Sequence, residues 1–172
     1  MPELIAALDG GGTKTELVWA DAMGNLGRMR ITVGCSPQDS PDWLTPLRQV
    51  LAALPNAPTR IVFGIPSFGE VPALDRSVTA EIARLCPTAA TILNDVALAY
   101  QGAFPDRGGV LVLAGTGSMA IAEGPNPTMQ TKALTAAQID TLAQRLSETP
   151  IEPANRREGG LEAVVTLPMD AA

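Results

Sequence analysis

Residues 9–16 read Asp-Gly-Gly-Gly-Thr-Lys-Thr-Glu, and two short apolar runs, residues 4–8 and 17–20, flank this stretch. Two apolar runs joined by a glycine-rich turn predict a β-hairpin. Three successive glycines let the backbone reach positive φ and let a ligand approach the chain closely. Consecutive backbone N–H groups in such a turn form a concavity that suits phosphate. The stretch therefore predicts the first hairpin of a sheet and, within it, a phosphate-binding loop.

Polar side chains extend the chemistry of this turn. Asp9 ends the first predicted strand, and Mg²⁺ takes only one or two carboxylates because it keeps most of its waters. Asp9 is therefore a candidate for holding Mg²⁺ through water, while Thr13 and Thr15 add hydroxyl donors. A plain tight turn is the alternative interpretation, but a hairpin turn needs only one or two residues of this kind.

Composition narrows the functional classes. The chain has 172 residues, 46% of them apolar and 3% aromatic, which is enough for an aliphatic core. The net charge of −6 argues against nucleic-acid binding, which needs a basic face, and scattered Lys and Arg argue against a membrane-surface role. No apolar run approaches the roughly 18 residues of a membrane span, and no secretory signal opens the chain. We expect a cytoplasmic protein.

Absent and rare residues restrict the chemistry further. Histidine is absent, which removes Ser-His and Cys-His nucleophiles and histidine metal sites. Cys35 and Cys86 are far apart in sequence and lack metal-ligand spacing, so reduced thiols without a catalytic role are expected. Any acid–base catalyst is therefore expected to be a carboxylate.

Hydrophobic periodicity and turn signals predict alternating elements along most of the chain. The predicted strands are 4–8, 17–20, 26–33, 59–65, 91–93, 110–114 and 119–122, and the predicted helices are 41–54, 74–85 and 96–103. Ser40 and Pro41 predict the start of the first helix, and Asn94 with Asp95 predicts the cap of the third. Three hairpin strands followed by alternating helices and strands predict an α/β fold, with one mixed sheet and helices on its faces.

Four loops follow the carboxyl ends of predicted strands, and in such sheets the ligand lies outside these ends. Asp9 and Asp95 lie on two of the loops, residues 66–70 form the third, and residues 115–118 form a second glycine turn. The sequence therefore predicts that these loops converge on one edge of the sheet.

The remainder of the chain has a different character. Residues 123–127 predict a linker, residues 135–148 predict a helix that starts with a capping box, and residues 161–167 predict a strand. We therefore expect one lobe over residues 1–122 and an atypical tail over residues 123–172.

Three motifs, in this order and spacing, carry a resemblance to a known family: residues 9–16, Asn94-Asp95-Val96, and residues 113–118, which read Leu-Ala-Gly-Thr-Gly-Ser. The chain resembles the N-terminal domain of glucosamine and N-acetylglucosamine kinases in the BadF/BadG/BcrA/BcrD ATPase family, within the actin–hexokinase–Hsp70 superfamily. The resemblance covers roughly residues 4–122. It implies a ribonuclease H-like mixed sheet that forms a single actin-like ATPase lobe.

The resemblance also implies that ATP binds with Mg²⁺ and that a sugar hydroxyl accepts the γ-phosphoryl group. Asp95 would be the general base, and Asp9 would orient Mg²⁺ through water. The residues implied to contact the nucleotide are Gly10, Gly11, Gly12, Thr13, Lys14, Gly115, Thr116 and Gly117. The residues implied to contact the sugar are Ser36, Gln38, Asp95, Ser118 and Met119. Ser36 or Gln38 would replace an asparagine that the family often has in that loop.

One departure from the family bears on activity. The family continues into a second domain through a Gly-Gly-Trp-Gly segment and a Gly-Asp-Glu-Gly-Ser segment, and neither follows residue 122. This chain by itself is therefore expected to have little or no kinase activity, with a homodimer or a separate second lobe as its partner. One alternative is an ATPase activator of a 2-hydroxyacyl-CoA dehydratase, although Cys35 and Cys86 are not placed for its iron–sulfur cluster. The other is a non-enzymatic lobe that binds another chain.

Overall fold

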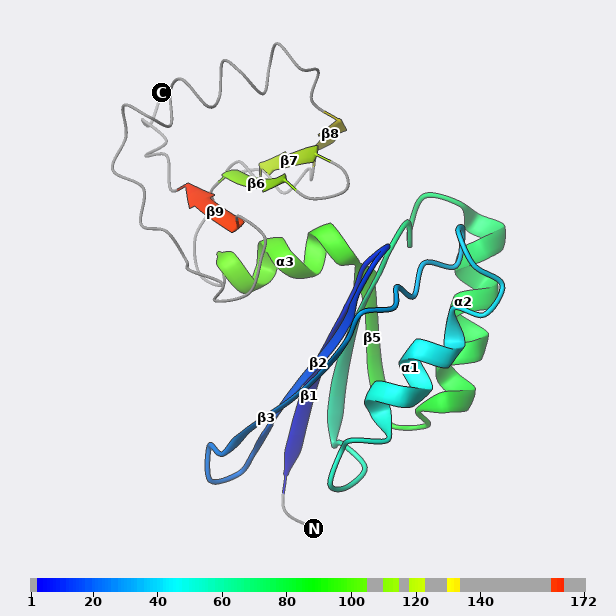
Figure 1. The fold of residues 1–172 in the computed structure, drawn as a ribbon, viewed down its shortest axis with the longest axis vertical. Coiled ribbons are helices and arrows are strands. Elements are labelled where there is room, and N and C mark those ends of the chain that lie inside the picture. Colours follow the sequence, from blue (N-terminus) through cyan, green and yellow to red (C-terminus); the bar gives the residue numbers. More distant parts are fainter. Residues whose placement is uncertain (1–2, 105–109, 115–117, 123–129, 134–161, 166–172) are drawn as a thin grey trace. The chain divides into compact units, whose positions relative to one another are not determined.

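The computed structural model of the chain describes residues 3–104, 110–114, 118–122, 130–133 and 162–165 (Figure 1). Its elements follow in the order β1 (Leu4–Gly10), β2 (Thr15–Asp21), β3 (Leu26–Ile31), α1 (Leu44–Leu51), β4 (Arg60–Ile65), α2 (Pro72–Leu85), β5 (Ala89–Asn94), α3 (Asp95–Ala103), β6 (Val110–Ala114), β7 (Ser118–Ala122), β8 (Gln130–Ala133) and β9 (Glu162–Val165). The order of elements predicted through residue 122 is confirmed.

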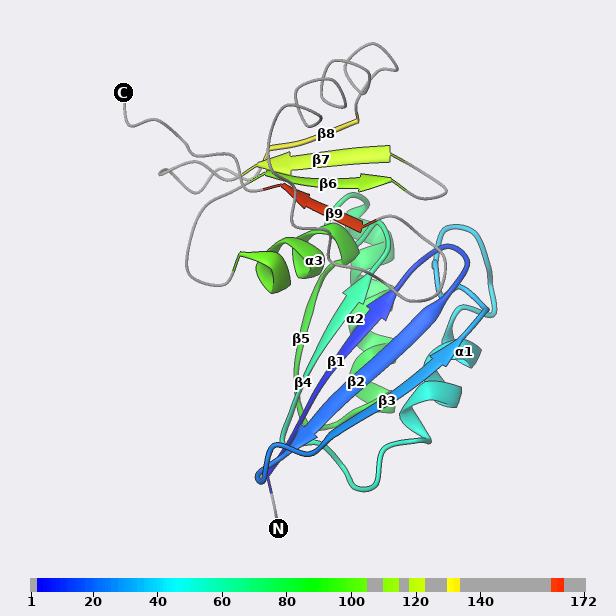
Figure 2. The same cartoon turned by 60° about the vertical axis from the view of Figure 1, so that its left-hand side comes forward.

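The first five strands form one mixed sheet in the order β3-β2-β1-β4-β5 (Figure 2). β2 runs antiparallel to β1 and β3, while β4 runs parallel to both β1 and β5. Because β1, β4 and β5 are parallel, their carboxyl ends lie at the same edge of the sheet. That edge carries Asp9, residues 66–70 and Asp95, so three of the four predicted loops share it.

One face of this sheet forms the hydrophobic core. Burial alternates along β1, and Leu8 on the covered face is completely buried. Helices α1 and α2 both lie on this side of the sheet and cover a mostly aliphatic cluster that also contains Trp43 and Phe63 (Figure 1). The start of α3 packs on the opposite face, because a Cβ added at Gly64 of β4 would meet Leu98 and the Cα of Asp95.

Two helix starts differ from the predictions. α1 begins at Leu44, and Ser40 does not cap it; the Ser40 hydroxyl instead accepts a hydrogen bond from Asp42 N at 3.2 Å within a preceding turn. α2 begins at Pro72, earlier than predicted, because proline fits the first helical position, where its missing N–H is not needed. The third cap is confirmed, since Val96 N donates to Asn94 Oδ1 at 3.0 Å.

The second hairpin corrects the prediction of a single sheet. β6 and β7 pair with each other in a separate antiparallel sheet of order β8-β7-β6-β9. A hairpin pairs its own two strands, so its local sequence does not tell which sheet it joins. β9 lies within residues 161–167, where a strand was predicted, and β8 was not predicted. The helix predicted over residues 135–148 lies outside the described residues.

Contacts divide the chain into two compact units, Met1–Ala99 and Tyr100–Ala172, and the division falls inside α3. The boundary predicted after residue 122 rested on the change in sequence character there, and it stays a prediction. No helix in the described ranges is long and apolar enough to cross a membrane.

Candidate functional site

The glycine loop between β1 and β2 packs against the segment that follows β3. Gly11 N donates to Lys14 O at 2.9 Å and closes the turn. Cys35 N donates to Gly11 O at 3.0 Å, and a Cβ added at Gly34 would collide with the backbone of Gly12. Backbone lies directly on backbone here, so position 34 requires a residue without a side chain.

The glycines of the loop provide close approach rather than unusual backbone angles. None of residues 10–12 has positive φ, so that part of the prediction is wrong. A Cβ added at Gly10 would lie 2.5 Å from Cys35 Sγ and 2.7 Å from Gly64 O. By contrast, nothing lies within 4 Å of a Cβ built at Gly12. The loop is therefore tightly packed at Gly10 and open at Gly12, where a ligand has room to approach.

The polar side chains of the loop divide into two groups. Thr15 is fully buried and its hydroxyl donates to Val33 O at 2.8 Å, so it supports the loop instead of facing a ligand. Lys14 Nζ lies 3.4 Å from Asp9 Oδ2, with the Lys14 side chain 27% exposed and that of Asp9 40% exposed. An ammonium group therefore lies beside the carboxylate that we expect to orient Mg²⁺.

Two carboxylates, those of Asp9 and Glu70, lie within electrostatic range of Asp95 at this edge. Burial raises the pKa of Asp95 above its ordinary value, and the negative charges of Asp9 and Glu70 raise it further. Hydrogen bonding from Val96 N opposes these effects without cancelling them. The fold thus brings Asp9 of β1 and Asp95 of α3 together, as the sequence predicted. It also places Glu70 near Asp95, whereas the sequence favoured an ordinary loop charge at position 70.

Asn94 connects two of the loops. Its Nδ2 donates to Phe68 O and to Glu70 Oε1, each at 3.3 Å, while its Oδ1 accepts from Val96 N. The sequence predicted only the cap at the start of α3. The contacts with residues 66–70 cross from one strand end to another, so no local pattern could have revealed them.

The loop after β3 contributes a buried thiol and a buried serine. Cys35 is completely buried, and burial raises the pKa of its thiol to about 11, with the charges of Asp9 and Asp95 contributing. The thiol is therefore neutral at physiological pH. Of the two residues implied to contact a sugar, Ser36 is buried at 4% exposure and Gln38 is exposed. Their roles stay predictions.

The second glycine turn is not tested by the structure. Gly115, Thr116 and Gly117 lie outside the described residues, and Ser118 and Met119 begin β7 in the second sheet. The predicted convergence is therefore established for three loops, and the fourth stays a prediction.

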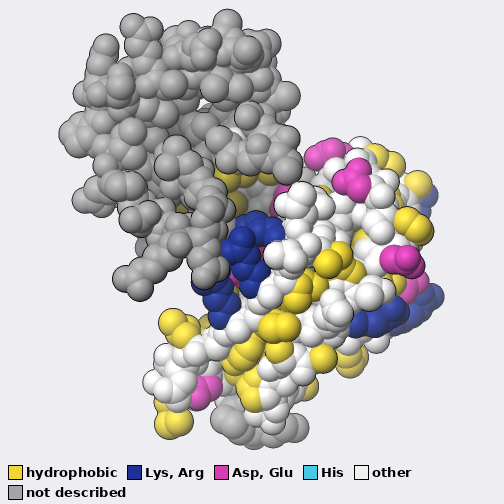
Figure 3. All heavy atoms as spheres, viewed as in Figure 1, with side chains coloured by type: hydrophobic (Ala, Val, Ile, Leu, Met, Phe, Trp, Pro, Cys, Tyr) yellow, Lys and Arg dark blue, Asp and Glu magenta, His cyan; other side chains and the backbone are white. Residues whose placement is uncertain are grey.

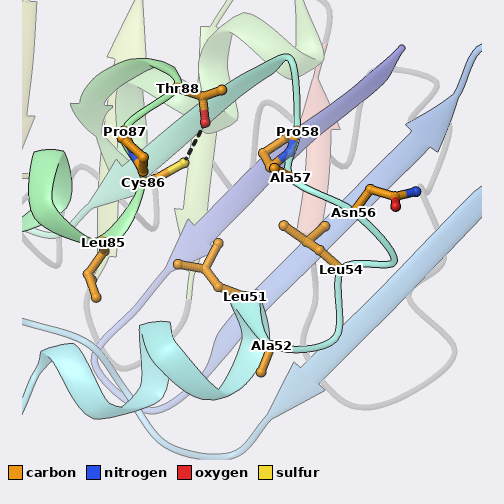
Figure 4. Close-up of a pocket in the computed structure, with 10 residues that line it drawn as sticks. All are labelled: Leu51, Ala52, Leu54, Asn56, Ala57, Pro58, Leu85, Cys86, Pro87 and Thr88. Atoms are coloured by element: carbon orange, nitrogen blue, oxygen red, sulfur yellow. Dashed lines mark hydrogen bonds between the residues drawn. The ribbon is translucent and has the colours of Figure 1, made fainter. Parts of the chain in front are cut away.

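A pocket of about 410 Å³ lies elsewhere, at the amino-terminal edge of the parallel strands (Figure 4). Side chains from the end of α1, the loop before β4 and the loop after α2 line it, among them Leu51, Leu54 and Cys86. No charged side chain lines it, and Cys86 Sγ lies 3.0 Å from Thr88 Oγ1. Ligands of such sheets bind at the other edge, so this pocket is not the candidate site.

The carboxyl edge has donors suited to magnesium. Among the described residues, no three His, Cys, Asp or Glu side chains are arranged to hold a metal ion directly. Mg²⁺ does not need such a cluster, because one or two carboxylates and several waters complete its shell. Asp9, partly exposed and near the half-buried Asp95, fits this requirement, and a cation there would reduce the repulsion between the two carboxylates.

We expect Asp95→Asn to raise the melting temperature at neutral pH. The folded-state pKa of Asp95 is raised, so the stability that it contributes is full below its ordinary pKa of 3.8 and is lost as pH rises through the folded-state pKa. An amide carries no charge and can keep the bond to Val96 N, so the gain should grow from acid to neutral pH. Circular dichroism melts across that range measure it.

Asp42→Asn is the control for this measurement, because Asp42 is an exposed carboxylate in the turn before α1. It should show no comparable gain. An Asp95→Asn difference that stays constant across the pH range would contradict an origin in burial and like charge.

No family model and no curated protein matches this chain. Solved structures do match it. A candidate N-acetylglucosamine kinase from Chromobacterium violaceum aligns at 21% identity and a TM-score of 0.55, covering 75% of this chain and 48% of its own. A candidate N-acetylglucosamine kinase from Porphyromonas gingivalis aligns at 21% identity and a TM-score of 0.55, covering 78% of this chain and 47% of its own.

A third structure broadens the comparison. The ethanolamine utilization protein EutJ from Carboxydothermus hydrogenoformans aligns at 14% identity and a TM-score of 0.56, covering 87% of this chain and 59% of its own. Identities this low show a shared fold alone. The fold is that of the actin-like ATPases, with the ribonuclease H-like mixed sheet that the sequence predicted. The chain spans about half the length of the two kinase structures.

Proposed function

We propose that this chain is the nucleotide-binding part of an ATP-dependent sugar kinase that acts on glucosamine or N-acetylglucosamine. One observation carries the proposal: Asp9, beside the glycine loop, and Asp95, at the start of α3, lie within electrostatic range at the carboxyl edge of β1, β4 and β5. The shared fold with two candidate N-acetylglucosamine kinases supports it.

In this proposal the glycine loop holds the phosphates of ATP. The open space at Gly12 lets a phosphate approach the backbone, and the Lys14 ammonium group adds positive charge next to it. Asp9 holds Mg²⁺ through water, and bound Mg²⁺ would neutralise negative charge on the phosphoryl group in transfer. The turn of Gly115, Thr116 and Gly117 would contribute further phosphate contacts.

Asp95 is the proposed base. It takes the proton of the sugar hydroxyl as that oxygen bonds to the γ-phosphorus, and the bond from the γ-phosphorus to the bridging oxygen breaks to release ADP. The raised pKa of Asp95 makes its carboxylate a stronger base than an exposed aspartate. Ser36, Gln38, Ser118 and Met119 are the proposed sugar contacts.

A second candidate function is a lobe that binds another chain. On the sheet face opposite the α1–α2 core, Ile5, Val18 and Leu26 are 46%, 41% and 85% exposed. Figure 3 shows apolar side chains interspersed with charged ones over the described part of one view of the molecule. Self-association of the chain that sedimentation detects at rising concentration, and that Val18→Ser reduces, would favour this candidate function.

ATP binding tests the kinase proposal first. We expect isothermal titration calorimetry to detect ATP binding that strengthens with Mg²⁺, and Asp9→Asn to remove most of that magnesium dependence. Transfer of labelled phosphate to glucosamine and N-acetylglucosamine is measured in parallel with excess chain under single-turnover conditions, because this chain by itself is expected to have little kinase activity. Asp95→Ala should lower this transfer by about a hundredfold or more while ATP still binds.

Asp42→Asn is the matched control, since it removes an exposed carboxylate before α1, and it should bind and transfer as the parent chain does. No measurable ATP binding, or transfer that survives Asp95→Ala, would overturn the kinase proposal.

A further inference from the structure

The loop formed by residues 66–70 is held in one shape by contacts at several points. Within it, Phe68 N donates to Ile65 O and Glu70 N donates to Ser67 O, each at 3.2 Å. Gly69 N donates to Asp75 Oδ1 of α2 at 2.9 Å. These contacts fix the loop to the end of β4 and to the first turn of α2.

Backbone angles show that this shape is imposed by its surroundings. Ser67 has a φ of 60°, the one positive value among the described non-glycine residues, and Gly69 has a φ of 90°. A non-glycine residue holds such an angle only where neighbouring contacts over-determine it, and such residues gather at functional sites. The loop lies at the carboxyl edge near Asp95, where a fixed loop shape would hold Glu70 at one position relative to the Asp95 carboxylate.

Asn94 supplies the contact from the third side. Its amide carries an acceptor and two donors, and the structure uses both kinds. The acceptor Oδ1 caps α3 through Val96 N, and the donor Nδ2 reaches Phe68 O and Glu70 Oε1. The residue that begins α3 is Asp95, so Asn94 ties the loop to the turn that carries the proposed base.

We propose that Asn94 is a positioning residue, which joins residues 66–70 to the first turn of α3 and so fixes where the Asp95 carboxylate lies relative to Glu70. We call the contacts of Asn94 with residues 66–70 and with Val96 the Asn94 joint. The joint is a property of the fold, and only its consequence in catalysis rests on the proposed function. Glu70 takes part as the side chain that Asn94 holds near Asp95.

Asparagine supplies both the acceptor that caps α3 and the donor that reaches Phe68 O and Glu70. Serine and aspartate cap a helix about as well as asparagine, but neither has an amide donor for Phe68 O and Glu70. Aspartate would also add a negative charge beside Glu70 and Asp95, and like charges at such range repel. The capping and joining roles are therefore separable by substitution.

Amide hydrogen exchange of the chain, resolved by NMR, separates these roles. In Asn94→Ser the Gly69 and Glu70 amides should exchange roughly tenfold faster, because hydrogen bonds to a carbonyl and a carboxylate are lost. The Val96 amide should stay protected, because serine still caps it. In Asn94→Ala the two loop amides should lose protection as in Asn94→Ser, and the Val96 amide should lose part of its protection, because only its bond to Asp95 Oδ1 remains. Glu70→Gln, which keeps an acceptor, should restore most of the loop protection that Glu70→Ala removes.

A kinetic measurement then connects the joint to catalysis. In the phosphoryl-transfer assay, Asn94→Ser should lower kcat about tenfold and leave the KM for ATP unchanged, because the glycine loop is untouched. A general loss of stability would not lower kcat while leaving the KM for ATP unchanged. Circular dichroism melts of Asn94→Ser check that the fold persists.

Each outcome decides a separate question. Loop amides in Asn94→Ser that exchange as in the parent chain would overturn the proposal, since Asn94 would then be a cap only. An unchanged kcat with a loosened loop would overturn the positioning role in catalysis. A loosened loop in a chain that binds no ATP would support the joint and overturn the kinase assignment alone.

Discussion

Gly34→Ala is expected to displace the glycine loop and to weaken ATP binding and stability together. A Cβ at position 34 would collide with the carbonyl of Gly12 and lie 2.7 Å from Gly11 O. Both neighbours are backbone, so no side-chain rotation relieves the overlap, and one segment must move. Overpacking of this kind destabilises by about 1–3 kcal/mol and occasionally more. The same movement breaks the bond from Cys35 N to Gly11 O that holds the loop.

Calorimetric titration with ATP and Mg²⁺, together with urea denaturation, measures both effects. Gly102→Ala is the control, because nothing lies within 4 Å of a Cβ at that position in α3 and alanine favours helix over glycine by up to about 1 kcal/mol. That variant should keep its stability and its ATP affinity. A Gly34→Ala protein as stable as the parent chain would show that the two backbone segments do not pack as described.

Phe63→Ala is expected to lower the free energy of unfolding by about 3–5 kcal/mol, the range for truncating a buried phenylalanine. Phe63 is completely buried on β4, where it lies between Leu8 of β1 and Ile92 of β5. Its removal leaves a cavity between the sheet and the helices that cover it, and the strands on both sides restrict any collapse. The expected loss is a large share of the stability of a small domain.

Urea denaturation followed by circular dichroism measures this loss. Ile5→Ala is the matched control, since Ile5 is an aliphatic residue of the same sheet that is 46% exposed on the opposite face. Ile5→Ala should lower the free energy of unfolding much less than Phe63→Ala does. Equal losses in the two variants would contradict the assignment of the core to the α1–α2 side.

Local sequence determined the features that depend on near neighbours in the chain. The hairpin around residues 9–16, the strand runs and the cap at Asn94 were all predictable, because hairpin turns and helix caps join groups a few residues apart. The common edge of Asp9, residues 66–70 and Asp95 also followed from the order of elements, since parallel strands end together.

Other features of the candidate site needed the tertiary structure. For residues 10–12 the sequence offered positive φ and the close approach of a ligand as reasons for glycine, and it offered no reason for Gly34. Gly10 and Gly34 are necessary because distant segments of the chain pack against them. Likewise, the Thr15 hydroxyl looked available to a ligand, but Val33 O accepts its hydrogen bond. In each case the partner lies far along the chain, beyond the reach of a local pattern.

What the sequence determined by itself was the type and order of the elements through residue 122 and the edge at which their polar residues meet. Only the tertiary structure decided that the hairpin of β6 and β7 forms a separate sheet and that Asn94 holds Glu70 beside Asp95. The physical reason is that periodicity and capping act over a few residues, whereas strand partners and cross-loop contacts are selected when the chain packs.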